Sequence, residues 1–250
     1  MLESFKRMFA RPAIARDLSA VSGWAQRCGH GFKRARGEDG FVLDGVLEGK
    51  PWRLEWGPPQ RAYIEGHELR LRMELKLPSD LQMLVLTRPL MGALERQTYE
   101  KFIEGTQTRI DTQTPEEMRW LVMFPKLDLA ALNNLRLRFG AVASSPEAGL
   151  AWLEGPLANQ LEHAAGTWLR GDPPFVLMTL RNRAYLRLQL AVPEPAVIAA
   201  ALALFETAVT QALCAASGHI GPASGWNSSG STAWQSMSAD EPVVPGPGRS

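Results

Sequence analysis

The sequence predicts an α+β protein: an antiparallel sheet with helices packed on one face, a helical N-terminal extension and a disordered C-terminal tail. The strongest observation is residues 67–77, where apolar and charged residues alternate strictly. Such alternation gives a strand one buried and one solvated face, which is typical of antiparallel sheets. Strands and helices also come in blocks, and this order favours α+β over α/β. After Ser217, Gly, Ser and Pro dominate, which predicts disorder.

The length and composition of the chain limit the classes of protein to which it can belong. The chain has 250 residues, of which 45% are apolar and 21% charged, with a formal net charge of +1. These values exclude a disordered chain, a collagen-like chain and a coiled coil, and they suffice for a sizeable core. Two cysteines cannot form a disulfide framework, and the first residues lack the apolar run of a secretory signal, so we expect a cytoplasmic protein. We divide the chain into a basic amphipathic helical segment (1–36), an α+β domain (37–216) and a disordered tail (217–250).

The first part of the chain is predicted to be one helix followed by strands. Residues 12–28 have apolar residues at helical spacing, and Pro12 suits a first helical turn. The glycine- and charge-rich residues 29–40 predict a loop, with Gly29 ending the helix in the left-handed conformation. Strands are then expected at 41–47, 52–56, 62–64, 67–77 and 81–87. The continuous apolar run of the last strand predicts a central position in the sheet.

Helices are predicted to dominate the middle of the chain. They are expected at 89–104, 115–125, 128–134 and 156–169, with a strand at 135–142. Two of them have candidate N-caps. In Thr114-Pro115-Glu116-Glu117, we expect Thr114 to cap the helix, Pro115 to occupy its first position and Glu117 to return a bond to the cap. Asp128 is expected to cap the short helix that follows.

A hairpin and a long helix are predicted next. Strands at 175–180 and 184–192 flank a turn at residues 181–183. Residues 196–216 are long enough to span a membrane, but their large side chains form one stripe opposite alanine and polar residues. Glu206 would also lie near the midpoint of the span, which is costly in a bilayer. We therefore interpret this segment as a core helix packed on the sheet.

No complete catalytic or cofactor motif is present, so we predict no catalytic residue, no metal site and no cofactor. The segment Cys28-Gly29-His30 is better explained as a helix C-terminus than as a nucleophile or metal ligand. On the strand 67–77, the charged residues are candidates for a small-molecule or enzyme site, although an ordinary solvated sheet face explains them better. These candidates are Glu68, Arg70, Arg72 and Glu74.

Tryptophans are frequent, with eight in the chain against three tyrosines. Trp52 and Trp56 are four residues apart, so alternation places both on one face of the same strand. Such a pair forms either part of the core or a platform for a ligand. The sequence leaves both alternatives open.

Both terminal segments differ from the rest of the chain. Residues 1–36 carry eight Lys and Arg against two acidic residues, a net charge of +6, whereas the remainder carries −5. Such a segment either contacts an acidic partner or anionic membrane, or packs on its own acidic domain. The candidate interaction residues are Phe5, Lys6, Arg7, Phe9 and Arg11, together with Trp226 and Trp234 of the tail.

From these features we predict a non-enzymatic protein-binding module whose two termini serve as contact segments. One alternative is a peripheral membrane protein attached through residues 1–16, whose binding to anionic vesicles would fall with salt. Another is a small-molecule binder or enzyme whose site is assembled only in three dimensions. Nucleic acid is not expected as a partner because no aromatic and basic reading surface can be traced. The oligomeric state stays open.

Overall fold

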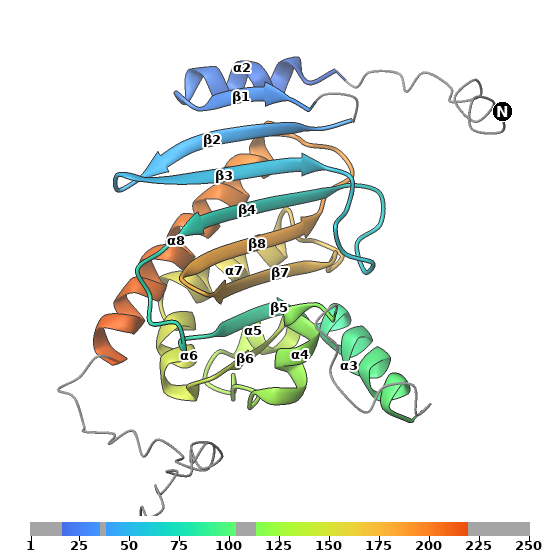
Figure 1. Ribbon diagram of the computed structural model, residues 1–250, viewed down its shortest axis with the longest axis vertical. Coiled ribbons are helices and arrows are strands. Elements are labelled where there is room, and N and C mark those ends of the chain that lie inside the picture. The colour runs from blue at the N-terminus through green and yellow to red at the C-terminus, as the bar shows by residue number, and fades with distance from the viewer. Residues whose placement is uncertain (1–16, 36–38, 104–113, 220–250) are drawn as a thin grey trace, which may run out of the picture. The chain divides into compact units, whose positions relative to one another are not determined.

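The structure, a computed structural model, describes residues 17–35, 39–103 and 114–219. These residues form a sheet of eight strands in which all hydrogen-bonded neighbours are antiparallel. The strands are β1 (Gly31–Arg34), β2 (Phe41–Leu47), β3 (Lys50–Gly57), β4 (Glu68–Glu74), β5 (Met83–Thr87), β6 (Phe139–Ala143), β7 (Phe175–Leu180) and β8 (Arg183–Gln189). Their spatial order is β1-β2-β3-β4-β8-β7-β5-β6, and Figure 1 shows it from β1 to β6.

Seven helices accompany the sheet within the described residues. They are α2 (Ser19–Arg27), α3 (Arg88–Ile103), α4 (Glu116–Met123), α5 (Asn133–Arg138), α6 (Pro146–Leu153), α7 (Pro156–Gly166) and α8 (Pro195–His219). The predicted α+β class is confirmed, including the helices packed on one face, because α2, α6, α7 and α8 share one hydrophobic core with that face. The structure adds a smaller second layer, in which α3 and α4 cover the other face over β5, β6 and β7.

The strand with the strict alternation is β4, and its register explains the pattern. Leu69, Leu71 and Met73 are buried in the main core, as are the directly opposite Trp56, Leu54 and Trp52 of β3. Trp52 and Trp56 are therefore core residues and not a platform for a ligand. The indole nitrogen of Trp56 donates a 2.8 Å hydrogen bond to the Leu190 carbonyl, which satisfies its buried polar group.

The long helix α8 lies on the far side of the sheet in Figure 1 and fills the main core. Its predicted stripe is buried, with Ile198 and Phe205 fully inaccessible to solvent. The indole nitrogen of Trp152 in α6 donates to the Ala208 carbonyl at 2.9 Å, which ties the two helices together. Among the described helices, α8 has the length and composition of a membrane span, and 44% of its apolar window is buried within the protein.

The central position predicted for β5 is wrong, because β5 is the next to last strand of the sheet, between β7 and the edge strand β6. All five of its residues are buried. Met83 and Val85 contribute to the main core, whereas Leu84 and Leu86 pack against α3 and α4 on the other face. A strand covered on both faces has no solvated side, so its sequence shows no alternation.

The loop predicted for residues 29–40 is partly wrong, because residues 31–34 form the edge strand β1. The backbone of β1 pairs with β2, and the Phe32 ring stacks on Phe41 with the ring centroids 5.7 Å apart. Short charged strands are typical of sheet edges, and this composition resembles that of a loop. The helix terminus was predicted correctly: Gly29 has a φ of 73°, and His30 packs between Trp24 and Trp52.

Three further local predictions are wrong. Residues 62–64 lie in the connection between β3 and β4 and form no strand. The strand predicted at 135–142 is wrong in its first half, because residues up to Arg138 belong to α5 and β6 begins at Phe139. Leu135 is buried and Leu137 is 69% exposed, so this short helix shows the same alternation as a strand. Six residues are too few for periodicity to separate a helix from a strand. Asp128 accepts a 2.9 Å bond from the Ala130 amide and closes a turn, and the helix begins only at Asn133.

Candidate functional site

The second face of the sheet is divided into an apolar part and a charged part. The apolar part lies under α3 and α4, over β7, β5 and β6. The charged part lies on β3, β4 and β8, where five arginines point away from the main core. We call this surface the arginine face; it consists of Arg53, Arg70, Arg72, Arg183 and Arg187.

The register of the strands places like charges directly opposite each other. Arg53 of β3 faces Arg72 of β4, and Arg70 of β4 faces Arg187 of β8. Like-charged cross-strand pairs are destabilising on their own. The arginine face therefore requires carboxylates between the guanidinium groups, and two glutamates supply them.

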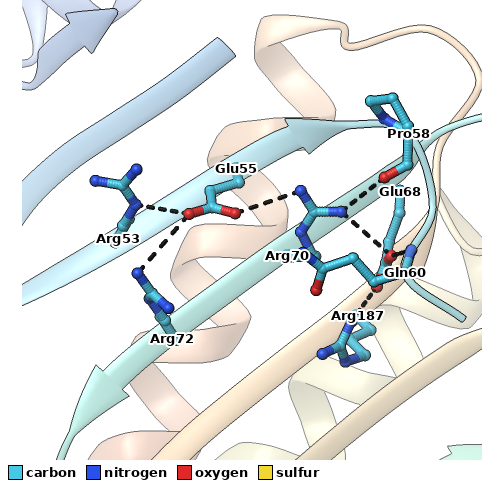
Figure 2. A network of polar contacts seen from close by, with 8 residues as sticks. All are labelled: Arg53, Glu55, Pro58, Gln60, Glu68, Arg70, Arg72 and Arg187. Carbon is cyan, nitrogen blue, oxygen red and sulfur yellow. Dashed lines mark hydrogen bonds and ion pairs between the residues drawn. The ribbon is translucent and has the colours of Figure 1, made fainter. Parts of the chain in front are cut away.

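Glu55 is the first of these carboxylates. It accepts a 2.6 Å bond from Arg53 Nε, and it also pairs with Arg70 at 3.3 Å and with Arg72 at 3.8 Å (Figure 2). Burial by itself would raise the pKa of Glu55, but the three neighbouring guanidinium groups, Arg53 foremost, outweigh it and lower the pKa below its ordinary value. Glu55 is therefore ionised at neutral pH and holds three arginines at once.

Glu68 is the second carboxylate, and its side chain is 0% exposed. One carboxylate oxygen accepts a 2.5 Å hydrogen bond from Arg187 (Figure 2). The other oxygen accepts a 2.6 Å bond from the backbone amide of Gln60 and lies 3.4 Å from Arg70. Arg70 also donates to the Pro58 carbonyl at 2.8 Å. The prediction that this strand has an ordinary solvated outer face is wrong at Glu68, because the connection between β3 and β4 covers that end of the face.

The other end of the arginine face is open. An open groove of about 530 Å³ lies there, lined by Asp44, Gly45, Pro51, Trp52, Arg53, Arg72, Met73, Glu74 and Arg183. The exposed fractions of its arginine side chains are 40% for Arg53, 57% for Arg72 and 48% for Arg183. Arg53 and Arg183 are engaged by carboxylates at 2.6 Å, whereas Arg72 approaches Glu55 only at 3.8 Å. Arg72 therefore has hydrogen-bond donors to offer to a ligand.

A second buried carboxylate network anchors the connection between β3 and β4. One oxygen of Glu117, on α4, accepts from Arg61 Nε at 2.6 Å and from the Tyr63 hydroxyl at 2.5 Å. Burial would raise the pKa of Glu117, but Arg61, with help from Tyr63, outweighs it and lowers the pKa. Burial and the Glu117 charge together raise the pKa of Tyr63. This network joins the arginine face to α4.

The capping arrangement predicted at this helix is wrong. No side chain caps α4, which begins at Glu116 after Pro115. Glu117 does not return a bond to Thr114, because its side chain is fully buried beneath the connection between β3 and β4. A buried partner 56 residues earlier in the chain leaves no local signal in the sequence.

The candidate interaction residues of the termini lie outside the described residues, so their roles stay predictions. The same holds for the membrane attachment through residues 1–16 and for the disordered tail from residue 220 onward. The predicted start of the tail at residue 217 is wrong, because residues 217–219 belong to α8.

Of the candidate residues for a small-molecule site, the structure brings Arg72 and Glu74 to the groove. It places Arg70 and the buried Glu68 at the other end of the face. Sequence reasoning missed Arg53 and Arg187, although both lie at outward positions of predicted strands. It also missed Arg183, which was predicted to lie in the turn but is the first residue of β8.

Within the part of the chain that the structure describes, no three His, Cys, Asp or Glu side chains come together as metal ligands. Cys28 and Cys214 are both exposed and unpaired with each other.

Comparison with known proteins gives one likeness of fold. No family model matches the chain, and no curated protein matches it. Among solved structures, the crystal structure of the mycobacterial trehalose monomycolate transport factor A, TtfA, is similar with a TM-score of 0.45 and 8% sequence identity. The match covers 77% of this chain and 92% of that one. A likeness of this degree says nothing about what the present chain binds.

Proposed function

We propose that this protein is a non-enzymatic binding module that engages another protein through the arginine face. The observation that carries the proposal is the open groove, around which Arg53, Arg72 and Arg183 present partly exposed guanidinium groups. Arginines at protein interfaces are effective anchors because the guanidinium group is planar and makes several directed hydrogen bonds.

The support for a binding role comes from preorganisation. At the groove, Glu55 holds Arg53 and Glu74 holds Arg183, each at 2.6 Å, before any partner arrives. Side chains that are already ordered lose little conformational entropy on binding, which increases affinity. The neighbouring connection between β3 and β4 is itself held by Arg61 and Tyr63 on Glu117, so the wall of the face is rigid as well.

The shape of the groove favours recognition over catalysis. It is open to solvent, and its lining combines three arginines with Asp44 and Glu74. Most reactions catalysed by charged groups need a site from which water is excluded. A protein surface laid on the groove would exclude water only upon binding, as interfaces do.

The terminal segments belong to the same proposal. Residues 1–16, with Phe5, Lys6, Arg7, Phe9 and Arg11, and the tryptophans of the tail would add contacts to a partner already held on the arginine face. A cytoplasmic location, in which Cys28 and Cys214 stay reduced, is part of the proposal too.

The proposal is tested by affinity purification of the full chain from its native cells. The wild type is compared with the double variant Arg53→Gln/Arg72→Gln and with Arg170→Gln, which removes one exposed charge from the end of α7. We expect one partner to be retained by the wild type and by Arg170→Gln and to be lost from the double variant. Equal retention by all three proteins would contradict the role of the arginine face.

A further inference from the structure

Resting on the proposed function, we infer that the occupant of the groove is an acidic, extended protein segment whose carboxylates are bound by Arg53, Arg72 and Arg183. The chemistry of the arginine face, its spacing and its openness each lead to this partner.

The charge of the face favours an acidic segment. Five arginines share the face with four carboxylates, and two of these, Glu55 and Glu68, are enclosed in the network. The carboxylates left at the groove are those of Asp44 and Glu74. Glu55 also pairs with Arg53 and lies 3.8 Å from Arg72 beside the groove, so the excess belongs to the whole face. There, five guanidinium groups exceed four carboxylates by one, which attracts negative charge.

The spacing of the arginines suits a chain of carboxylates. Arg53 and Arg72 are direct partners on adjacent strands, and adjacent strands lie about 4.8 Å apart. Arg183 lies one strand further, beside Glu74. A segment that crosses the strands obliquely would meet the three guanidinium groups in succession, and each can donate a forked pair of hydrogen bonds to a carboxylate.

The existing ion pairs lower the affinity of the groove for single small anions. A ligand carboxylate competes with Glu55 for Arg53 and with Glu74 for Arg183, so one isolated anion gains little. Several carboxylates on one chain overcome this competition because the first contact raises the effective concentration of the others. The openness of the groove also disfavours small ligands, which are usually bound in enclosed cavities.

The test uses the full chain and a fluorescent peptide of alternating Glu and Ser, about 12 residues and so about 40 Å when extended. The matched control peptide has Gln in place of Glu, and inorganic phosphate serves as a competitor. Binding is followed by fluorescence anisotropy. We expect the Glu peptide to bind, the Gln peptide not to bind, and the affinity to fall as salt is raised.

The variants locate the binding. Arg53→Gln/Arg72→Gln should weaken the Glu peptide by about tenfold or more, because each lost charged hydrogen bond weakens a complex strongly. Arg170→Gln should leave the affinity unchanged. Thermal unfolding of each variant verifies that the fold is retained.

Several results would overturn the inference. They are no binding of the Glu peptide, equal binding of both peptides, an unchanged affinity in the double variant, or displacement by phosphate at concentrations similar to those of the peptide. If the partner from native cells still depends on Arg53 and Arg72 while the Glu peptide fails, the acidic occupant is wrong and the proposed function stands. If both measurements fail, the proposed function is wrong as well.

Discussion

Arg70 and Arg187 lie directly opposite each other on β4 and β8, and both guanidinium groups approach the buried carboxylate of Glu68. Two like charges directly opposite each other destabilise a sheet by electrostatic repulsion. Here the Glu68 carboxylate offsets this repulsion, and because it is completely shielded from water its interactions with both arginines are strong. The covered end of the arginine face is thus built around Glu68.

Substitution of Glu68 tests this arrangement. In Glu68→Gln, Arg70 and Arg187 lose their common counter-charge, and the Gln60 amide keeps at most a neutral acceptor. We expect the free energy of unfolding to fall by about 2–4 kcal/mol, measured by urea denaturation. The matched control is Glu74→Gln on the same strand and face. Its side chain is 74% exposed and pairs with Arg183, so its loss should cost less than about 1 kcal/mol. Equal effects of the two variants would contradict the central role of Glu68.

Glu117 predicts a dependence of stability on pH. Its pKa lies below the ordinary value of 4.5 in the folded protein, because Arg61 and Tyr63 outweigh the effect of burial. A carboxyl with a lowered folded pKa adds stability above its unfolded pKa, and this stability is lost as the pH falls through the folded pKa. Glu117→Gln should therefore lower the free energy of unfolding by about 2–3 kcal/mol at neutral pH. Below pH 4.5, its stability should decline less steeply than that of the wild type.

The control for this measurement is Glu154→Gln, at an exposed carboxylate that follows α6. Urea denaturation at a series of acidic pH values should give the wild-type stability and the wild-type slope for this variant. A Glu117→Gln protein with the wild-type slope would show that Glu117 does not titrate as the ion pair requires.

Gly45 is expected to be intolerant of a side chain. A Cβ atom at this position would overlap the six-membered ring of Trp52, its direct cross-strand partner, which is 2% exposed. Gly45→Ala should destabilise the protein by about 1–3 kcal/mol, because the tryptophan cannot move without disturbing the core. By contrast, Gly92→Ala in α3 meets no atom within 4 Å and should stabilise the protein by about 0.5–1 kcal/mol. Thermal unfolding of both variants compares the two positions, and a neutral Gly45→Ala would contradict the close packing.

Trp56 is expected to contribute more to stability than Trp168, which packs against the same main core. The ring of Trp56 stacks on His67 with centroids 4.3 Å apart, and its indole nitrogen holds the Leu190 carbonyl. Trp56→Phe leaves that carbonyl without the indole donor and removes buried volume, so we expect a loss of about 2–3 kcal/mol. Trp168 is only partly buried, and Trp168→Phe should cost about half as much. Urea denaturation followed by circular dichroism provides the comparison.

Much of the fold can be predicted from local pattern. The alternation along 67–77 identifies β4 and its buried face, and the stripe on 196–216 identifies α8 as a core helix. Both predictions are correct because each element is long enough to repeat its pattern over several helical turns or strand pleats. The division of residues 135–142 between α5 and β6 could not be predicted, because six residues hold too little periodicity.

The candidate site could be predicted only in part. Alternation places Arg70 and Arg72 on the outer face of their strand, as expected. The opposition of Arg53 to Arg72 and of Arg70 to Arg187 depends on the register between strands, which one strand's sequence does not contain. The burial of Glu68 and Glu117 depends on the connection between β3 and β4 folding back over them. These are tertiary contacts, and a single sequence carries no local signal of them.

Site-specific photo-crosslinking in native cells tests most directly whether a partner protein binds on the arginine face. The photoreactive residue replaces Val46, which is 67% exposed and is the register partner of Pro51 in the groove lining. A matched position is Ala203, exposed on α8. We predict a crosslinked partner at position 46 that disappears in Arg53→Gln/Arg72→Gln and is absent at position 203. No crosslink at position 46, the same crosslink at both positions, or a crosslink that persists in the double variant would contradict the account.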